Sequence, residues 1–352
     1  MNWREYCKRV TPYVPGEQPK INNLIKLNTN ENPYPPAPVV KDALMRLAED
    51  YDCLRRYPKP DCDALVDALS EYTGLSKDRI FTGVGSDDVI GMAFGTFYKS
   101  DMPVLFADIT YSFYEVWAEL VGFPVELVPV KDDFTIDIND YKKQNGGIVI
   151  ANPNAPTGIA LPLEKIEEVL KFNRDSVVIV DEAYVDFGGE SAIGLIDKYD
   201  NLLVTQTYSK SRNLAGLRVG MAFGQPELIA RIKDIKFATN SYTMNEPTLR
   251  IASEILNDDA YFKDCCNKVM TTRKWSVEEL KKLGFTVLDS CANFVFVSHK
   301  SLDANVIYKE LRERGILVRH FSKPERIDNF LRISIGTDDE MKALFNALKE
   351  II

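Results

Sequence analysis

A lysine surrounded by hydroxyl groups is the first feature of this sequence that points to chemistry. Lys210 lies in Thr205-Gln-Thr-Tyr-Ser-Lys-Ser211, directly after the apolar run 202–204, and Arg218 follows eight residues later. A lysine amine forms Schiff bases with carbonyl compounds once desolvation or a neighbouring cation lowers its pKa. Hydroxyl groups and an arginine are suitable donors to a phosphate. The combination suits pyridoxal 5′-phosphate, which carries an aldehyde and a phosphate; a surface lysine in a polar loop is the competing interpretation.

Two other polar stretches also follow short apolar runs. Gly83-Val-Gly-Ser-Asp-Asp88 precedes a predicted helix, so the N–H groups of Gly85, Ser86 and Asp87 can bind an anion, although an ordinary strand–helix turn has the same composition. Asp181 ends the apolar run 177–180 and can pair with a buried cation, such as a protonated pyridine nitrogen. This run also looks like a Walker B strand, but the sequence contains no Gly-Lys dipeptide, which excludes a P-loop NTPase.

Two stretches have a structural and a functional interpretation. Asn152-Pro-Asn-Ala-Pro-Thr-Gly158 is a rigid loop that presents an asparagine, here Asn154, or it is a plain turn. Tyr111 stands among aromatic residues at the start of a predicted helix, where its ring can stack on a flat cofactor or pack in the core.

Composition excludes several classes of protein. The 352 residues carry a net charge of −9 without a basic stripe, which argues against a nucleic-acid partner. The first residues are charged where a signal peptide is apolar, and no apolar run reaches the length of a membrane span. Six cysteines without a CxxC pair indicate reduced thiols and a cytoplasmic protein. With two histidines and no HExxH motif, we expect no metal site.

The elements that must position these residues alternate between helix and strand after residue 37. Such alternation predicts an α/β fold with a mostly parallel sheet wrapped by helices, whose ligands lie at the carboxyl ends of the strands. Helices are predicted at 38–49, 61–73, 86–98, 111–121, 162–172 and 226–236, and strands at 80–82, 104–106, 125–130, 148–151, 177–180 and 202–204.

The ends of the chain differ from this middle part. Residues 1–36 are rich in proline and asparagine, and we expect an extended arm that docks on the small domain or a partner subunit. Residues 37–244 form the predicted large domain, and residues 245–352 a smaller α+β domain. Its predicted elements are a long helix at 246–283 broken near residue 257, strands at 285–288, 293–297, 316–318 and 330–335, a helix at 302–313, and a last helix opened by the capping box 337–340.

Taken in order, these stretches resemble the fold type I pyridoxal-phosphate aminotransferases and, within them, the histidinol-phosphate aminotransferase family. The resemblance covers nearly the whole chain and implies transfer of the amino group of L-histidinol phosphate to 2-oxoglutarate, giving imidazole acetol phosphate and glutamate in histidine biosynthesis. The matching pieces are Thr11-Pro-Tyr13, Leu27-Asn-Thr-Asn-Glu-Asn-Pro33, Arg56-Tyr-Pro58, Asp181-Glu-Ala-Tyr184, Ser209-Lys210, Ala215-Gly-Leu-Arg218 and Leu331-Arg-Ile-Ser-Ile-Gly-Thr337.

The resemblance assigns roles to individual residues. It implies that Lys210 binds the cofactor and carries the proton, that Asp181 pairs with the ring nitrogen, and that Tyr184 binds the phenolic oxygen. It implies a homodimer in which Tyr57 reaches the cofactor phosphate of the neighbouring subunit. The remaining expected cofactor contacts are Gly85, Ser86, Asp87, Tyr111, Asn154, Thr207, Ser209 and Arg218, and the expected substrate contacts are Tyr13, Asn32, Arg319 and Arg332.

The chain departs from the family pattern at Ala155. The family usually has an asparagine there, which helps to hold the phenolic oxygen, and the adjacent Asn154 is the candidate to replace it. Three alternatives remain open: an aromatic amino-acid aminotransferase, a threonine-phosphate decarboxylase of the same fold, and a catalytically silent binding protein. The presence of Lys210, Asp181, Tyr184 and Arg218 argues against the last.

Overall fold

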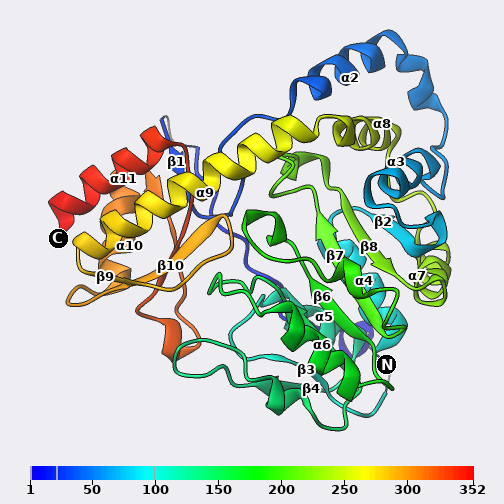
Figure 1. Ribbon diagram of the computed structural model, residues 1–352, viewed down its shortest axis with the longest axis horizontal. Coiled ribbons are helices and arrows are strands. Elements are labelled where there is room, and N and C mark those ends of the chain that lie inside the picture. The colour runs from blue at the N-terminus through cyan, green and yellow to red at the C-terminus, as the bar shows by residue number, and fades with distance from the viewer. Residues whose placement is uncertain (1, 21–22, 99) are drawn as a thin grey trace.

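A seven-stranded sheet forms the centre of the larger part of the molecule (Figure 1). The computed structural model describes residues 2–20, 23–98 and 100–352. Neighbouring strands follow the order β2-β8-β7-β6-β5-β3-β4. The strands are β2 (Ile80–Gly83), β3 (Val104–Ala107), β4 (Val125–Val128), β5 (Gly147–Ala151), β6 (Val178–Asp181), β7 (Leu202–Thr207) and β8 (Gly220–Gly224).

The sheet is mostly parallel, as predicted. Strands β4, β3, β5, β6 and β7 pair in parallel, and β8 pairs antiparallel with both β7 and β2. Strand β8 is not among the predicted strands, because Gly220 and Gly224 weaken its strand pattern. Gly220 is needed for close packing: a Cβ atom there would lie 2.2 Å from the backbone of Gly85.

Helices cover both faces of this sheet. Alternate residues of the buried strands face opposite sides, so that Ile148 and Ile150 of β5 join one core cluster and Val149 joins the other. The first cluster includes residues of α2, α3, α6 and α8, and the second includes residues of α4, α5 and α7. These helices are α2 (Pro38–Glu49), α3 (Asp63–Thr73), α4 (Ser86–Phe97), α5 (Phe113–Val121), α6 (Leu163–Phe172), α7 (Pro226–Thr239) and α8 (Glu246–Glu254).

The C-terminal part has its own four-stranded antiparallel sheet, in the order β12-β13-β10-β9, packed against helices. The predicted break in the long helix lies at the 3-10 turn Ile255–Asn257, and the predicted capping box of Thr337 and Glu340 is present. Helix α9 runs from the end of α8 across to α11 (Figure 1). The elements are α9 (Asp259–Lys282), β9 (Phe285–Val287), β10 (Phe294–His299), α10 (Ala304–Glu313), β11 (Ile316–Leu317), β12 (Arg319–His320), β13 (Leu331–Ser334) and α11 (Asp338–Ile351).

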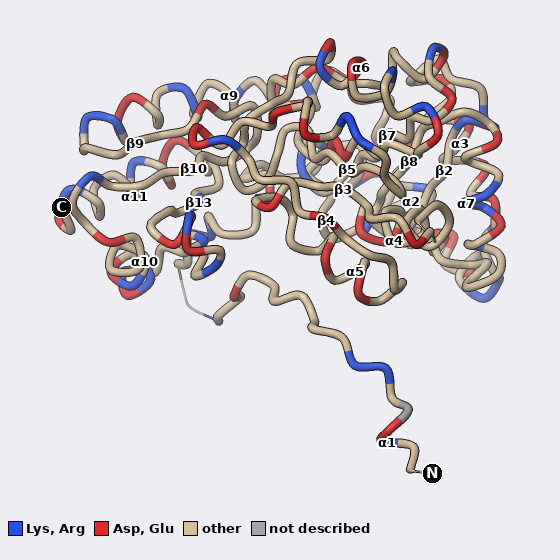
Figure 2. The backbone as a smooth tube through the Cα atoms, turned by 90° about the horizontal axis from the view of Figure 1, so that it is seen from below, with Lys and Arg blue, Asp and Glu red and all other residues tan. Residues whose placement is uncertain are grey.

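The N-terminal segment is extended, and Figure 2 shows it running outside the rest of the chain, with α1 (Trp3–Tyr6) near its end. Its backbone N–H at Thr11 donates to Glu119 of α5 over 2.9 Å, and Glu17 pairs with Arg312 of α10 at 3.0 Å. After residues 21 and 22, which lie outside the described part of the chain, β1 (Ile25–Lys26) pairs in parallel with β11. The arm therefore contacts α5 of the larger part and α10 of the C-terminal part, and β1 and β11 form a separate two-stranded sheet.

Across the residues that the structure describes, we find no helix of the length and apolar character that a membrane crossing requires.

Candidate active site

Most of the predicted site residues lie around one cavity of about 300 Å³ at the carboxyl ends of the parallel strands. Strands β5, β6 and β7 end at Ala151, Asp181 and Thr207, and all three residues line the cavity. The arm and the small sheet close the opposite side. The predicted members of this lining are Tyr13, Ser86, Asp87, Tyr111, Asp181, Tyr184, Thr207, Ser209, Lys210, Arg218, Arg319 and Arg332.

Lys210 extends its amine into this cavity from the loop after β7. Nζ donates to the backbone carbonyl of Thr29 in the arm over 3.2 Å. Burial lowers the pKa of Lys210 to about 8, and the positive charge of Arg332 acts in the same direction. A fraction of the amines is therefore unprotonated near neutral pH, which is the state that attacks a carbonyl carbon or accepts a proton.

Asp181 is a buried carboxylate at the end of β6. The hydroxyl of Tyr114 donates to Oδ2 over 2.6 Å, and the hydroxyl of Thr205 donates to Oδ1 over 3.3 Å. Burial raises the pKa of Asp181 to about 6, although both hydrogen bonds oppose the shift. A cation placed against this carboxylate would keep it ionised.

Tyr184 follows Asp181 by three residues, and the arm orients it. The amide of Asn30 donates to the Tyr184 hydroxyl over 2.9 Å, and the hydroxyl of Ser334 in turn donates to the amide oxygen of Asn30 over 3.0 Å. Burial raises the pKa of Tyr184, so that its hydroxyl stays protonated. A ligand oxygen beside this tyrosine thus meets a hydrogen-bond donor.

One end of the cavity gathers donors for an anion. Arg218 extends Nη1 to within 3.4 Å of the Ser209 hydroxyl oxygen, and the Thr207 hydroxyl lies 3.0 Å from the same oxygen. Gly85, at φ 87°, precedes α4, and a Cβ atom there would lie 2.4 Å from the Arg218 guanidinium. The glycine therefore allows Arg218 to approach the N-terminus of α4, where Ser86 begins the helix and unpaired N–H groups attract negative charge.

Two aromatic rings and two arginines occupy the other parts of the cavity. Tyr111 donates its hydroxyl to Asp87 Oδ1 over 2.9 Å, and its ring packs against that of Tyr13 from the arm, with the centroids 6.1 Å apart. Arg332 of β13 donates to the backbone carbonyl of Asn28 over 3.1 Å, while its Nε is buried without a partner among the described residues. Arg319, its neighbour across β12 and β13, also lines the cavity.

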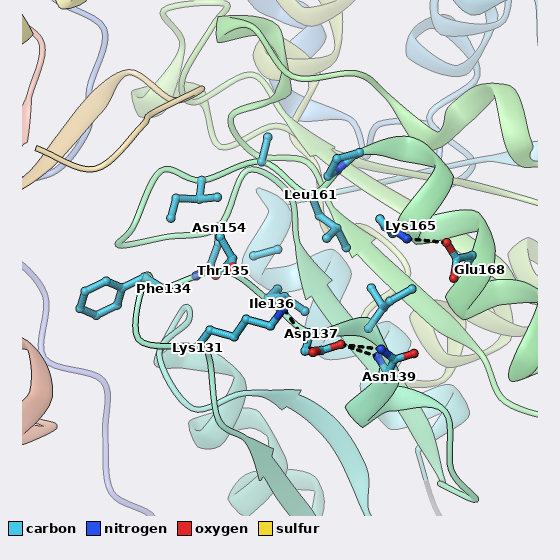
Figure 3. A pocket seen from close by; sticks show the side chains of 15 residues that line it. Lys131, Phe134, Thr135, Ile136, Asp137, Asn139, Asn154, Leu161, Lys165 and Glu168 are labelled. Atoms are coloured by element: carbon cyan, nitrogen blue, oxygen red, sulfur yellow. Dashed lines mark hydrogen bonds and ion pairs between the residues drawn. The ribbon is translucent and has the colours of Figure 1, made fainter.

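The structure does not bring Asn154 into this cavity. Its side-chain amide donates to the Ile109 carbonyl over 2.9 Å, and its oxygen accepts the Thr110 hydroxyl over 2.8 Å. Asn154 instead lines a neighbouring cavity, where Figure 3 shows it near Thr135. Adjacent residues in this loop point in different directions, because Ala155 is the one that lines the site cavity.

Two other predicted residues contact the site differently from the expectation or not at all. Asn32 donates its amide to the backbone carbonyl of Lys210 over 3.1 Å, so that it holds the lysine loop. Tyr57 is 81% exposed and stacks on Tyr242 with the ring centroids 4.6 Å apart. Within the described chain, Tyr57 is not part of the cavity lining.

Three residues that act through others were not predicted from the sequence. Asn30 and Tyr114 position Tyr184 and Asp181, and Thr29 accepts from Lys210 through its backbone. Asn30 lies in the matched motif 27–33, and it adopts a left-handed φ of 55°, which asparagine tolerates better than most residues. Nothing in the sequence distinguishes the Tyr114 hydroxyl from that of a core tyrosine.

Comparison with known proteins identifies relatives of the whole chain. Residues 22–348 match the family model "Aminotransferase class I and II". The chain is 51% identical to a histidinol-phosphate aminotransferase from Clostridium acetobutylicum, covering 99% of each chain, and 52% identical to histidinol-phosphate aminotransferase 2 from Dechloromonas aromatica, covering 99% of this chain and 98% of the relative.

A solved structure has the same architecture. The crystal structure of histidinol-phosphate aminotransferase from Sinorhizobium meliloti in complex with pyridoxal-5′-phosphate superposes with a TM-score of 0.84 at 25% identity, covering 93% of this chain and 90% of that one. The predicted fold type I architecture is confirmed. The chain therefore belongs to the class I and II aminotransferases and, within them, to the histidinol-phosphate aminotransferase family.

Proposed function

We propose that this chain is a pyridoxal-phosphate-dependent aminotransferase that transfers the amino group of L-histidinol phosphate to 2-oxoglutarate. The products are imidazole acetol phosphate and glutamate, in histidine biosynthesis. The observation that carries the proposal is the meeting of Lys210 and Arg332 in one cavity: a lysine with a lowered pKa lines the same cavity as a guanidinium whose Nε is buried without a partner among the described residues. The names of the relatives at 51% and 52% identity support the choice of substrate.

The donor set fits pyridoxal 5′-phosphate. The amine of Lys210 suits its aldehyde, and the group of Arg218, Ser209 and the N-terminus of α4 suits its phosphate. The buried carboxylate of Asp181 suits its ring nitrogen, and the hydroxyl of Tyr184 suits its phenolic oxygen. When bound, the cofactor withdraws electrons from the substrate Cα, so that the proton on this carbon can leave.

Lys210 moves that proton. With the cofactor bound, the free amine of Lys210 would take the proton from the substrate Cα and, as the ammonium form, would donate it again. The pKa of about 8 lies close to neutrality, so that both the acceptance and the donation of a proton are accessible. The buried carboxylate of Asp181 and the protonated ring nitrogen would each stabilise the charged form of the other. Asp181 would therefore keep the ring nitrogen protonated.

The two arginines are proposed to bind the anionic end of the substrate. Arg332 has an unpartnered Nε, and both arginines otherwise donate to neutral backbone carbonyls of the arm: Arg332 to Asn28, and Arg319 to Val14 and Pro15. A phosphate or a carboxylate is a stronger acceptor than a neutral carbonyl. Because the guanidinium fork pairs with either anion, one site can accept both the phosphorylated donor and the dicarboxylate acceptor.

A homodimer is part of the proposal. Tyr57 is exposed, is not part of the cavity lining of its own chain and stacks on Tyr242, and the chain exposes further apolar side chains that a partner subunit could cover. These side chains are Leu44, Met45, Tyr51, Leu54 and Tyr242. We propose that Tyr57 donates to the cofactor phosphate of the partner subunit.

We also propose that the chain is divided into an arm (1–36), a large domain (37–244) and a small domain (245–352). The cytoplasmic location stays a prediction.

Mixed dimers test the shared site. A dimer of one Lys210→Ala chain and one Tyr57→Ala chain should contain one complete site. A dimer of either variant alone contains no complete site. Activity on mixing should therefore exceed the sum of the separate activities, as measured by glutamate formation. Activity that never exceeds this sum, in samples shown by mass spectrometry to contain mixed dimers, would exclude the transfer of Tyr57 across an interface.

Product analysis tests the reaction itself. Purified enzyme loaded with cofactor should form glutamate from histidinol phosphate and 2-oxoglutarate with a higher kcat/KM than from phenylalanine. It should release no carbon dioxide from threonine phosphate. A preference for phenylalanine would identify an aromatic aminotransferase, and carbon dioxide release would identify a decarboxylase; either result would overturn the proposed substrate.

A further inference from the structure

A third cavity, of about 490 Å³, lies beside the lysine loop, and neither of the two proposed substrate arginines lines it. Helix α3 contributes Tyr72, the segment after Tyr184 contributes Asp186, and the loop around Lys210 contributes Ser211 and Arg212. Thr207 lines both this cavity and the site cavity. We name it the Arg212 cavity; its volume falls within the range of pockets that bind small molecules.

One nitrogen of the Arg212 guanidinium lacks a hydrogen-bonding partner among the described residues. Only 6% of the surface of Arg212 is exposed, and this nitrogen, Nη1, is fully buried. The guanidinium carbon lies 3.8 Å from the ring centroid of Phe262 and 4.8 Å from that of Tyr72. Among the described residues we find no ion pair within 4.0 Å to Arg212. A buried guanidinium is costly without an anion, and its planar fork suits a carboxylate.

The acidic residues around Arg212 are engaged in other contacts or stand too far away. Asp259 pairs with Lys263 at 2.6 Å and accepts the hydroxyl of Tyr72 over 3.0 Å. Asp186 accepts the hydroxyl of Ser211 at Oδ2. Burial raises the pKa of Asp186, and the charge of Arg212 opposes this shift, so the two groups interact although no ion pair joins them. Opposite charges thus face the cavity with a gap between them.

The rest of the lining is largely apolar. Leu69, Ile193 and Met221 contribute side chains from α3, from the loop after β6 and from β8. Among the other hydrogen-bonding side chains of the lining, Ser191 and Gln206 donate to the carboxylate of Glu182, and Thr73 donates to the carbonyl of Leu69. The hydroxyl of Tyr208 is buried without a partner among the described residues. A ligand here therefore meets one cation, one anion, the unpartnered hydroxyl of Tyr208 and an otherwise largely apolar surface.

We propose that the Arg212 cavity binds a free α-amino acid with an apolar side chain, its carboxylate on Arg212 and its ammonium group on Asp186. This ligand is distinct from the substrate, and it affects the reaction through the residues that connect the two cavities. Ser211 is the next residue after Lys210, Asp186 is the second after Tyr184, and Thr207 borders both cavities. Occupancy therefore changes the position of the lysine loop and, with it, the rate of proton transfer.

The binding experiment uses holoenzyme in which sodium borohydride has fixed the cofactor to Lys210, so that amino acids cannot react at the site cavity. Calorimetry with L-leucine, L-isoleucine, L-methionine and L-phenylalanine, one at a time, should show at least one that binds with one site per chain. Its methyl ester and its N-acetyl derivative should not bind, because each lacks one of the two charges. Absence of binding by all four would overturn the proposal, and so would equal binding of the N-acetyl derivative.

Variants locate the site. Asp186→Asn preserves the shape of the side chain, and Arg212→Gln removes the cation; both should abolish the binding seen with the unmodified chain. Arg231→Gln, on the exposed face of α7, is the matched control and should bind normally. Should Arg212→Gln fail to fold, Asp186→Asn alone decides the question. Binding that persists at full affinity in a folded variant would overturn the assignment, whatever the result of the transamination assay.

Discussion

The two walls of the site cavity are held in different ways. On the large-sheet side, side chains hold each other: Tyr114 and Thr205 donate to Asp181, and the hydroxyls of Thr207 and Ser209 lie 3.0 Å apart. On the opposite side, the two arginines donate to backbone carbonyls of the arm, Arg332 to Asn28 and Arg319 to Val14 and Pro15. The first wall is preorganised for the cofactor, and the second keeps donors that a charged substrate can take over.

The largest effect is expected at the lysine of the first wall. Lys210→Ala removes the amine that binds the cofactor and carries the proton, so turnover should fall by at least about 10⁴-fold. The measurement is glutamate formation under saturating substrates, with Lys198→Ala on the surface as the control. Appreciable turnover by a folded variant, purified free of host aminotransferases, would contradict the mechanism.

A smaller loss is expected from Asp181→Asn. The amide keeps the shape of the side chain and can still meet Tyr114 and Thr205, but it cannot stabilise a protonated ring nitrogen. Proton removal from the substrate should slow by on the order of 10³-fold, while the cofactor remains bound. Single-turnover kinetics followed by absorbance measure this step. Near-normal rates would remove Asp181 from the chemistry.

The same residue should affect the stability of the apoenzyme. Because burial raises the pKa of Asp181 from 3.8 to about 6, the folded state holds this proton more tightly than the unfolded state. The resulting stabilisation is complete below pH 3.8 and is lost as the pH rises to about 6, with a total on the order of 3 kcal/mol. Urea unfolding across this range should show the loss in the native chain and not in Asp181→Asn. Identical pH profiles of the two proteins would contradict it.

The smallest effects are expected at the second wall. Arg332→Gln should raise KM for both substrates by about tenfold to a hundredfold, because it removes a charged donor next to the substrate anion. Arg319→Gln should raise KM by less than about tenfold, since Arg319 is held by the exposed arm. Arg326→Gln, which contacts Val130 and Lys131 outside the cavity, is the control. A larger effect at Arg319 than at Arg332 would reverse the assignment of the principal anion contact.

The first wall was largely predictable from the sequence, and the second only in part. Lys210, Asp181 and Thr207 follow directly from strand ends, and parallel strands bring their carboxyl ends to one edge. The bond from Asn30 to Tyr184 joins residues 154 positions apart, which no local pattern encodes. The direction of the Asn154 side chain depends on the geometry of its loop, which its residue type does not determine. The role that we propose for Tyr57 lies in the partner subunit, so a single chain does not display it.

The visible absorption spectrum of the purified holoenzyme, before and after histidinol phosphate is added without a keto acid, tests the central claim most directly. The band of the cofactor bound to Lys210 should disappear and be replaced by absorption typical of pyridoxamine phosphate. An unchanged band with histidinol phosphate, together with bleaching by another amino acid, would contradict the proposed substrate. No band after reconstitution with cofactor would contradict the assignment of the cavity itself.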